Sequence, residues 1–444
     1  MVFRITNRTG RSATFSVAGR RVSVSARRVS SPTISLSAGR AAYSCTVAGR
    51  RVGRGFVAVT APPAPVPEHR IAVRDVNGFG EFYDRVGGAK FVPRGNNYVR
   101  LAAQVDIFGR TQVYHSTFNV GEYDAARADA ALSRMAAAGY NVARVFLNTT
   151  CARGCIADMR TGQISASYVA SLSDFLRRAR AHGVFVMLTG GWLPRGGAYD
   201  ALEAEIRRDV FDNVNLIFLT PQGIEMSIHF WRDLVRELIR QKAPLDAIFA
   251  YSLWNEASVD FQYPPFTLSA GRVTTANGET YEMASSADQR RMIDDAFVHY
   301  TDRVRAAILE ADPTALVTIG FWTAPEIPAG VVARRSAADF VDIHPYPGLD
   351  GTFGQAMQKY GIEGPTAKPV VIGEMGAFRH AFGTAGDAAA QLVEWQRQSC
   401  AYGVDGWLFW TWDTDEQPEL WNALSGGGAI EEALAPKSRP DPCA

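Results

Sequence analysis

Two carboxylates in this chain each close an apolar run of residues, which is an unusual place for a charge. Glu256 follows Asn255 at the end of "AIFAYSLWNE", and Glu374 ends "PVVIGE". Burying an unpaired carboxylate costs several kcal/mol, so such a residue is normally exposed, paired or used in chemistry. Two carboxylates at one site can divide the roles of nucleophile and general acid if their environments differ.

Other polar and aromatic side chains stand at or near the ends of similar apolar runs. They are Asn97 within residues 90–98, Arg144 within 141–148, His344 and Tyr346 within 340–346, and Trp410 and Trp412 within 404–412. Hydroxyl-rich substrates need hydrogen-bonding groups and aromatic faces, and these residue types supply both. They are therefore candidates for binding a substrate beside the two carboxylates.

Eight apolar, strand-like runs alternate with helical patterns along the chain. The runs are 90–98, 141–148, 184–190, 247–255, 315–322, 340–346, 369–374 and 404–412, and the helical patterns are clearest at 124–138, 166–182, 223–241, 287–310 and 386–401. Apolar strands joined by helical crossovers indicate a parallel sheet covered by helices, and eight repeats predict a closed (β/α)8 barrel. A doubly wound open sheet is the alternative, although no glycine-rich fingerprint follows the first strand.

The predicted barrel brings the candidate residues to one end of the molecule. Functional groups of such barrels gather at the carboxyl ends of the strands. Strands four and seven face each other across the barrel, so we expect Glu256 to face Glu374. A retaining glycosidase needs its two carboxylates about 5 to 5.5 Å apart, a separation that this arrangement makes reachable.

The order of these motifs resembles clan A of the glycoside hydrolases, and most of all its family 5, which holds cellulases and mannanases. The motifs are "VPRGNNYVRL" on strand one, Arg144 on strand two, "WNE" on strand four, "HPY" on strand six, "GE" on strand seven and "FWTW" on strand eight. The resemblance covers about residues 71–444. It implies a metal-independent retaining glycosidase without a cofactor, acting on an oligo- or polysaccharide with β-linkages, manno- or gluco-configured.

The resemblance also implies roles for single residues. Glu256 would be the general acid/base and Glu374 the nucleophile. Asn255 would hydrogen-bond the 2-hydroxyl of the sugar, and Arg144 and Tyr346 would favour the ionised form of Glu374.

The remaining candidates would bind the substrate. Asn97 and His344 would line the same face of the site, and Trp410, or Trp412 as a second choice, would stack on the sugar. Many family members place a His just after strand three, where this chain reads "LTGGWLPRGG". Trp192 or Arg195 would take over contacts there.

Other functions stay open on the sequence alone. A transglycosylase would use the same residues, and a carbohydrate-binding protein on a degenerate barrel would use none of them for catalysis. A metal-dependent barrel hydrolase is less favoured, because His344 stands in H-x-Y rather than H-x-H.

Two insertions are expected to shape the specificity of the site. Residues 191–222 follow strand three, and residues 257–284 follow strand four. The second contains "ANGE" between alternating, Thr-rich runs, which predicts a β-hairpin. We expect this hairpin to wall one end of the cleft and so to favour short or chain-end substrates.

The N-terminal segment differs in charge from the rest of the chain. Residues 1–60 carry 11 Arg and no Lys, Asp or Glu, whereas the remaining 384 residues carry 35 basic and 45 acidic side chains. "VAGRRV" occurs at 17–22 and again at 47–52, so a small β module and a disordered Arg/Ser-rich arm are both compatible with it. A solvated basic extension is favoured over a polyanion-binding one, and nucleic acid is not expected as a partner. "APPAPVPEHR" at 61–70 predicts a stiff linker.

The length and composition of the chain limit its domain organisation and its cellular location. The chain has 444 residues, enough for a barrel of about 250 residues and a smaller module. No apolar run approaches the roughly 18 to 20 residues that span a bilayer. The first 30 residues lack the apolar stretch of a secretory signal, so the protein either acts inside the cell or begins after its export signal; the implied activity favours secretion.

The five cysteines do not form a zinc-binding pattern. Cys151 and Cys155 in "CARGC" are close enough for a disulfide, with two free thiols as the alternative. Cys45, Cys400 and Cys443 are scattered along the chain.

Overall fold

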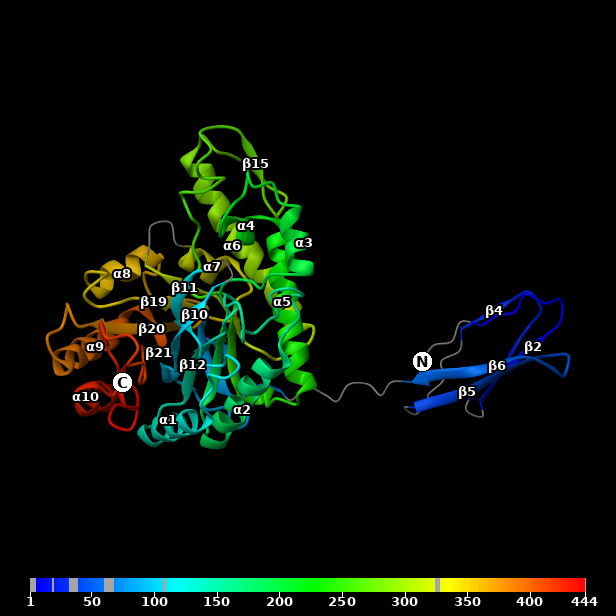
Figure 1. Cartoon of the computed structure of the whole chain (residues 1–444), viewed down its shortest axis with the longest axis horizontal. Coiled ribbons are helices and arrows are strands. Elements are labelled where there is room, and N and C mark those ends of the chain that lie inside the picture. The colour runs from blue at the N-terminus through cyan, green and yellow to red at the C-terminus, as the bar shows by residue number, and fades with distance from the viewer. Residues whose placement is uncertain are drawn as a thin grey trace. The chain divides into compact units, whose positions relative to one another are not determined.

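The computed structural model describes residues 5–17, 20–31, 39–59, 68–106, 109–323 and 328–443. The chain divides into two compact units, Met1–Pro65 and Val66–Ala444, which can be followed by colour in Figure 1. The division falls within the stretch predicted to be a stiff linker, and residues 61–67 of that stretch lie outside the described residues.

The larger unit is built on a closed barrel of parallel strands. In barrel order these are β9 (Arg94–Asn97), β12 (Val142–Phe146), β13 (Phe185–Thr189), β14 (Ile248–Ser252), β17 (Val317–Thr318) with β18 (Gly320–Trp322), β19 (Val341–His344), β20 (Val370–Phe378) and β21 (Val404–Trp410). β17 pairs with β14 and β18 with β19, so the two short pieces act as one fifth strand. β21 pairs with β9, which excludes the open sheet. Each of the eight predicted runs overlaps a strand, and the predicted (β/α)8 fold is confirmed.

Helices follow the strands and surround the barrel (Figure 1). They are α1 (Ala125–Ala138), α2 (Ala166–His182), α5 (Pro221–Arg240), α6 (Ser286–Leu309), α7 (Ala329–Arg335), α8 (Phe353–Tyr360) and α9 (Ala385–Ser399), with α10 (Ser425–Leu434) near the end of the chain. α1 shows why these segments are helical. Asp124 caps its first turn, Gly139 ends it in the left-handed conformation, and the buried positions Ala128, Ala131, Leu132 and Met135 recur at helical spacing.

A hairpin covers the amino-terminal end of the barrel. It consists of β7 (Ile71–Val76) and β8 (Phe79–Asp84). Phe82 is fully buried, and the centroid of its ring lies 5.3 Å from those of Phe249 and Phe340 at the starts of two barrel strands. Because this end is packed with aromatic side chains, any site has to form at the carboxyl ends of the strands.

Insertions extend the carboxyl end of the barrel. β10 (Leu101–Val105) and β11 (Thr111–His115) form a hairpin after β9 that is not among the elements predicted from the sequence. α3 (Ala198–Ala204) and α4 (Asn215–Leu219) follow β13. The hairpin predicted after strand four is present as β15 (Arg272–Thr274) and β16 (Thr280–Glu282).

Two disulfide bonds are present in the barrel unit. One joins Cys151 to Cys155, which decides between the two alternatives for "CARGC". The other joins Cys400 to Cys443 across 43 residues and was not predicted. Such a link near the end of the chain stabilises the fold by restricting the unfolded chain. Cys45 is a free thiol.

The smaller unit is a β module. Its main sheet has the order β3-β2-β5-β6, formed by β2 (Ala13–Val17), β3 (Arg20–Val24), β5 (Gly39–Val47) and β6 (Arg50–Val59), and β1 (Ile5–Thr6) pairs with β4 (Val29–Ser30). Both copies of "VAGRRV" stand at hairpins in the same register, because Val17 pairs with Arg20 and Val47 with Arg50. The repeat therefore marks two pairs of antiparallel strands in the same register.

In the described part of the chain, no helix is both long enough and apolar enough to cross a membrane.

Candidate active site

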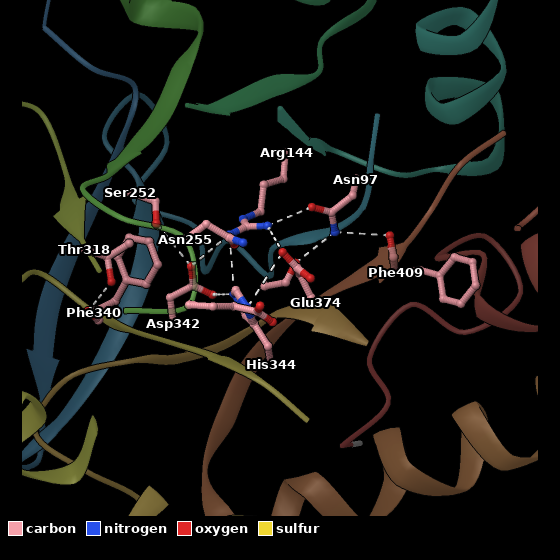
Figure 2. A network of polar contacts seen from close by, with 12 residues as sticks. Asn97, Arg144, Ser252, Asn255, Thr318, Phe340, Asp342, His344, Glu374 and Phe409 are labelled. Atoms are coloured by element: carbon pink, nitrogen blue, oxygen red, sulfur yellow. Dashed lines mark hydrogen bonds and ion pairs between the residues drawn. The ribbon is translucent and has the colours of Figure 1, made fainter. Parts of the chain in front are cut away.

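Polar side chains from five strands meet at the carboxyl end of the barrel (Figure 2). They are Asn97 on β9, Arg144 on β12, Asn255 and Glu256 just beyond β14, Asp342 and His344 on β19, and Glu374 on β20. The structure thus brings together residues that are up to 277 positions apart in the sequence. Six of these seven residues were predicted from the sequence, and Asp342 was not.

Arg144 connects most of this cluster. Its side chain is fully buried, and Figure 2 shows the guanidinium directed at Glu374 between Asn97 and Asn255. Nη1 donates to Glu374 Oε1 at 2.5 Å and to Asn97 Oδ1 at 3.0 Å, while Nη2 donates to Asn255 Oδ1 at 2.8 Å. One cation therefore fixes side chains from three other strands.

Glu374 is almost completely buried and is held through both oxygens. Oε1 accepts from Arg144, and Oε2 accepts from the Tyr346 hydroxyl at 2.8 Å. Burial raises the pKa of Glu374, whereas His344, Arg144 and the Tyr346 hydrogen bond lower it, and burial prevails. The predicted contacts of Arg144 and Tyr346 do favour the carboxylate, but they offset burial only in part.

His344 lies between the two glutamates. Its Nδ1 is 3.3 Å from Glu256 Oε1 and 3.7 Å from Glu374 Oε1, and its Nε2 is 3.4 Å from Asp342 Oδ1. Burial alone would lower the pKa of His344, but the three carboxylates outweigh it and raise the pKa to about 9. The site therefore contains a second buried cation beside Arg144 at neutral pH.

Glu256 differs from Glu374 in its surroundings. The chain beyond β14 stays bonded to its neighbours, because Asn255 N donates to Gly190 O at 2.9 Å and Ala257 N to Gly320 O at 2.8 Å. Between them Glu256 has a φ of 51°, in the left-handed region, and its side chain is 35% exposed. The buried Glu374 and the partly exposed Glu256 are thus two carboxylates in unlike environments.

The residues beside the two glutamates explain parts of the motifs. A Cβ at Gly373 would lie 1.9 Å from Asp342 Oδ1, so the "GE" motif needs glycine to let β20 pass this side chain. Asp342 precedes His344 by two residues on β19 and therefore faces the same side of the strand. That spacing is the signal by which the sequence could have identified Asp342.

The β10–β11 hairpin adds two residues that the sequence analysis missed, Tyr114 and His115. The His115 ring stacks on Phe146, with centroids 4.2 Å apart and planes within 4°, and meets Trp410 edge-on. Burial, aided by the charge of Arg144, lowers the pKa of His115 to about 3, so the imidazole stays neutral. Its Nδ1 is buried without a hydrogen-bond partner among the described residues.

A cavity of about 580 Å³ opens above Glu256, and we call it the central cavity. Its lining includes Tyr114, His115, Phe146, Gly190, Gly191, Trp192, Asn213, Trp254, Asn255, Glu256 and residues 258–262. Trp192 is 43% exposed on its wall, which agrees with the predicted position of this residue. The β15–β16 hairpin packs against α6 and contributes no residue to this lining; residues 258–262 form the wall expected of it.

The two tryptophans of strand eight differ. Trp410 is 7% exposed, donates from Nε1 to Gln417 Oε1 and packs edge-on against Phe146, so its role as a platform stays a prediction. Trp412 was wrongly included, because it is 1% exposed and packs against Tyr140 in the core, with the Arg134 guanidinium over its ring. β21 ends at Trp410, so the strand alternation does not extend to Trp412.

Glu256, His344 and Glu374 could also be considered as metal ligands. One potential ligand atom from each lies within 4.8 Å of the others. However, Arg144 and the protonated His344 already place two positive charges against these carboxylates. A divalent cation would be repelled by Arg144 and would have to displace the proton of His344, and both effects disfavour metal binding here.

No protein-family model and no curated protein sequence matches the chain. Solved structures do match. An endo-1,4-β-mannanase from Rhizomucor miehei aligns with a TM-score of 0.56 and 14% identity over 83% of this chain and 100% of that one. A glycoside hydrolase family 5 mannosidase from the same organism aligns at 0.50 and 12% identity over 82% and 96% of the two chains.

A third match is the exo-β-1,4-mannosidase Op5Man5 from Opitutaceae bacterium strain TAV5. It aligns with a TM-score of 0.55 and 17% identity over 83% of this chain, and the alignment spans 63% of the length of Op5Man5. Identities this low establish the fold and not the activity. The resemblance stated from the sequence is therefore confirmed for the fold: the chain has the (β/α)8 barrel that it shares with a solved mannanase and two solved mannosidases, one of them of glycoside hydrolase family 5.

Proposed function

We propose that the protein is a retaining glycosidase that cleaves a β-linked, manno- or gluco-configured carbohydrate by double displacement. The observation that carries the proposal is the approach of Glu256 to Glu374, because one carboxylate oxygen of each lies within 4.8 Å of the other. Retaining glycosidases hold their carboxyl groups about 5 to 5.5 Å apart, whereas inverting enzymes need about 6.5 to 9.5 Å to admit a water between them. The approach of Glu256 to Glu374 therefore supports a retaining rather than an inverting reaction.

In the first step Glu374 attacks the anomeric carbon while Glu256 gives its proton to the leaving oxygen. The glycosidic bond breaks, and a glycosyl ester forms on Glu374. Arg144 and Tyr346 hold the two oxygens of Glu374, so the carboxylate keeps one orientation during the attack. In the second step Glu256, now ionised, takes a proton from water, and the hydroxide displaces Glu374 with overall retention.

Asn255 is placed to orient the sugar. Its Oδ1 accepts from Arg144, and among the described residues its Nδ2 has no hydrogen-bond partner. The amide therefore offers a donor toward the cavity that Asn255 lines. A hydrogen bond from this group to the 2-hydroxyl would strengthen as positive charge develops on the ring.

The choice of sugar is supported by the matched structures. Two of them are an exo-β-1,4-mannosidase and an endo-1,4-β-mannanase. The first substrates to use are therefore aryl β-mannosides and β-glucosides, together with the matching oligosaccharides. Products longer than the substrate at high concentration would indicate that a sugar, and not water, resolves the intermediate.

The test compares the wild type with Glu374→Ala, Glu256→Ala and Asp260→Asn. Asp260 lines the same cavity and is hydrogen-bonded to Asn213, so it is a matched carboxylate without a proposed catalytic role. We expect Glu374→Ala to lose several orders of magnitude in kcat and Asp260→Asn to lose little. Azide should restore activity to the Glu256→Ala variant and give a β-glycosyl azide as the product, because this small anionic nucleophile needs no general base.

Two results would contradict the proposal. One is wild-type activity in Glu374→Ala, which would place the chemistry elsewhere. The other is a first-formed product of inverted configuration, observed by NMR during the first turnovers.

A further inference from the structure

A second cavity, of about 500 Å³, adjoins the central cavity, and we call it the side cavity. Tyr114, Trp192 and Asn213 line both cavities, so the two share a wall. Burial and the negative charge of Glu256 together raise the pKa of Tyr114, which places this wall within electrostatic reach of the proposed general acid. A molecule bound at Glu256 can therefore extend into the side cavity.

The charged residues of the side cavity are paired with one another. Arg195 bonds Glu203 at 2.6 Å, Arg208 pairs with Glu203 and with Asp212, and Arg110 bonds Asp106 at 2.9 Å. Three cations thus balance three carboxylates in this lining. The side cavity offers neither a net charge nor an unpaired ion to attract a charged ligand.

The remaining surface of the side cavity is largely aliphatic. Its apolar side chains are Leu193, Pro194, Leu216, Ile217 and Met226, together with the rings of Tyr114, Trp192 and Tyr263; the uncharged polar residues Gln112, Thr150 and Asn213 are fewer. A sugar unit carries hydroxyl groups around its ring, and burying them against aliphatic side chains leaves hydrogen bonds unmade. An alkyl or aryl group has no hydrogen bonds to lose in the same place, and its transfer from water to an apolar surface is favourable.

The proposed mechanism decides which part of a substrate would enter. Glu256 protonates the leaving oxygen, so the leaving group must lie on the side of Glu256. Asn255, which would hold the sugar, lines the central cavity together with Glu256, and none of Asn255, Glu256 and Glu374 lines the side cavity. The group attached to the leaving oxygen therefore faces the side cavity, and the sugar that becomes bound to Glu374 does not.

We propose that the side cavity binds the apolar part of the leaving group, so that the preferred substrate is a β-glycoside of an alkyl or aryl alcohol. This inference rests on the proposed glycosidase function. The reaction stays balanced: Glu256 supplies the proton of the released alcohol, Glu374 forms the ester with the anomeric carbon, and water later restores both groups.

The first experiment measures kcat/KM for methyl, butyl, hexyl and octyl β-glycosides of the sugar that the enzyme accepts. The corresponding alcohols are almost equally good leaving groups, so differences report binding and not reactivity. We expect kcat/KM to rise about fourfold for each methylene that enters the side cavity, until the cavity is filled.

Two substitutions should reverse this gain. Leu193→Lys places a charge on the aliphatic surface, and Ile217→Phe narrows the side cavity. Both should reduce kcat/KM for the octyl glycoside tenfold or more while the methyl glycoside changes by less than about threefold. A nearly unchanged kcat/KM for the methyl glycoside would show that the variant is folded. Val113→Lys is the matched control, because Val113 is 60% exposed on β11 and lines neither cavity.

The outcomes separate this inference from the proposed function. Turnover of no glycoside at all contradicts the function, whereas equal turnover of the methyl and octyl glycosides contradicts the inference alone. A methyl glycoside esterified with octanoate at O6 tests the direction. If that ester and not the octyl glycoside gained in kcat/KM, the cavity would lie on the other side of the cleaved bond and the inference would be wrong.

Discussion

At the barrel mouth two buried cations, Arg144 and His344, lie against three carboxylates, whereas residues 1–60 carry eleven Arg and no acidic residue. Every Arg of the β module whose side chain is described is exposed. Water can solvate an exposed guanidinium, but a buried one needs partners of opposite charge. The buried cations of the barrel therefore depend on neighbouring carboxylates, whereas the exposed Arg residues of the β module need almost no neighbour of opposite charge. The predictions below test this difference.

Replacing Arg144 should have the largest effect. Arg144→Met leaves Glu374 buried without its closest counter-charge, and breaking a buried pair in this way costs about 3 to 5 kcal/mol of unfolding free energy. Activity should fall by roughly a thousandfold or more, because Glu374 and Asn255 lose the group that orients them. Urea unfolding and kcat measure both effects. A variant as stable and active as the wild type would show that the guanidinium is dispensable.

The charge of His344 should appear in the pH dependence of stability. Its pKa is raised to about 9 from an ordinary 6.5, so the folded state binds a proton more tightly than the unfolded state does. The resulting stabilisation is fully present below pH 6.5 and is lost as the pH rises through 9, by about 3 kcal/mol in all.

The matched variants for this prediction are His344→Gln and His182→Gln. His182 is a partly exposed residue of α2 that pairs with Asp129. Urea unfolding between pH 6 and pH 9 should give a flatter curve for His344→Gln, while His182→Gln follows the wild type. Parallel curves for all three proteins would mean that His344 is neutral in the folded state.

Removing one hydrogen bond from Glu374 should have a smaller effect. Tyr346→Phe deletes the donor to Oε2, a charge-assisted bond that contributes about 1.5 to 3 kcal/mol, so kcat should fall roughly tenfold to a hundredfold. This bond lowers the pKa of Glu374, so its loss should shift the acidic limb of the activity profile to higher pH.

Tyr140→Phe is the control for this prediction, because it deletes a buried hydroxyl that donates to Glu431 O away from the two carboxylates. It should change stability and leave the pH profile where it is. If the acidic limb of the activity profile did not move in Tyr346→Phe, that limb would not report the ionisation of Glu374.

The same contrast explains what the sequence could predict. Each strand-end motif, such as "WNE" or "HPY", is contiguous, and a regular barrel brings all such ends together, so the site followed from local patterns. His115 could not be found in this way, because its position depends on stacking against Phe146, 31 residues further along. Trp412 was misjudged because the chain leaves the strand after Trp410. The link from Cys400 to Cys443 depends on the path of the chain after α10, which no local pattern predicts.

The smallest effect is expected in the β module. Arg21, Arg51 and Arg54 are exposed and pair in register with Ser16, Thr46 and Ser44. Changing all three to Gln removes like charges from neighbouring strands. The free energy of unfolding of the module should therefore stay within about 0.5 kcal/mol of the wild-type value.

Hydrogen exchange of the β2 and β5 amides in the full chain measures this. Phe15→Ala is the matched change in the core of the same sheet, where Phe15 is 7% exposed, and it should cost about 3 kcal/mol or more. If the triple Gln variant exchanged as fast as Phe15→Ala, the guanidiniums would be making contacts that hold the module together. The exposed charges of residues 1–60 would then depend on their neighbours as strictly as the buried charges of the barrel do.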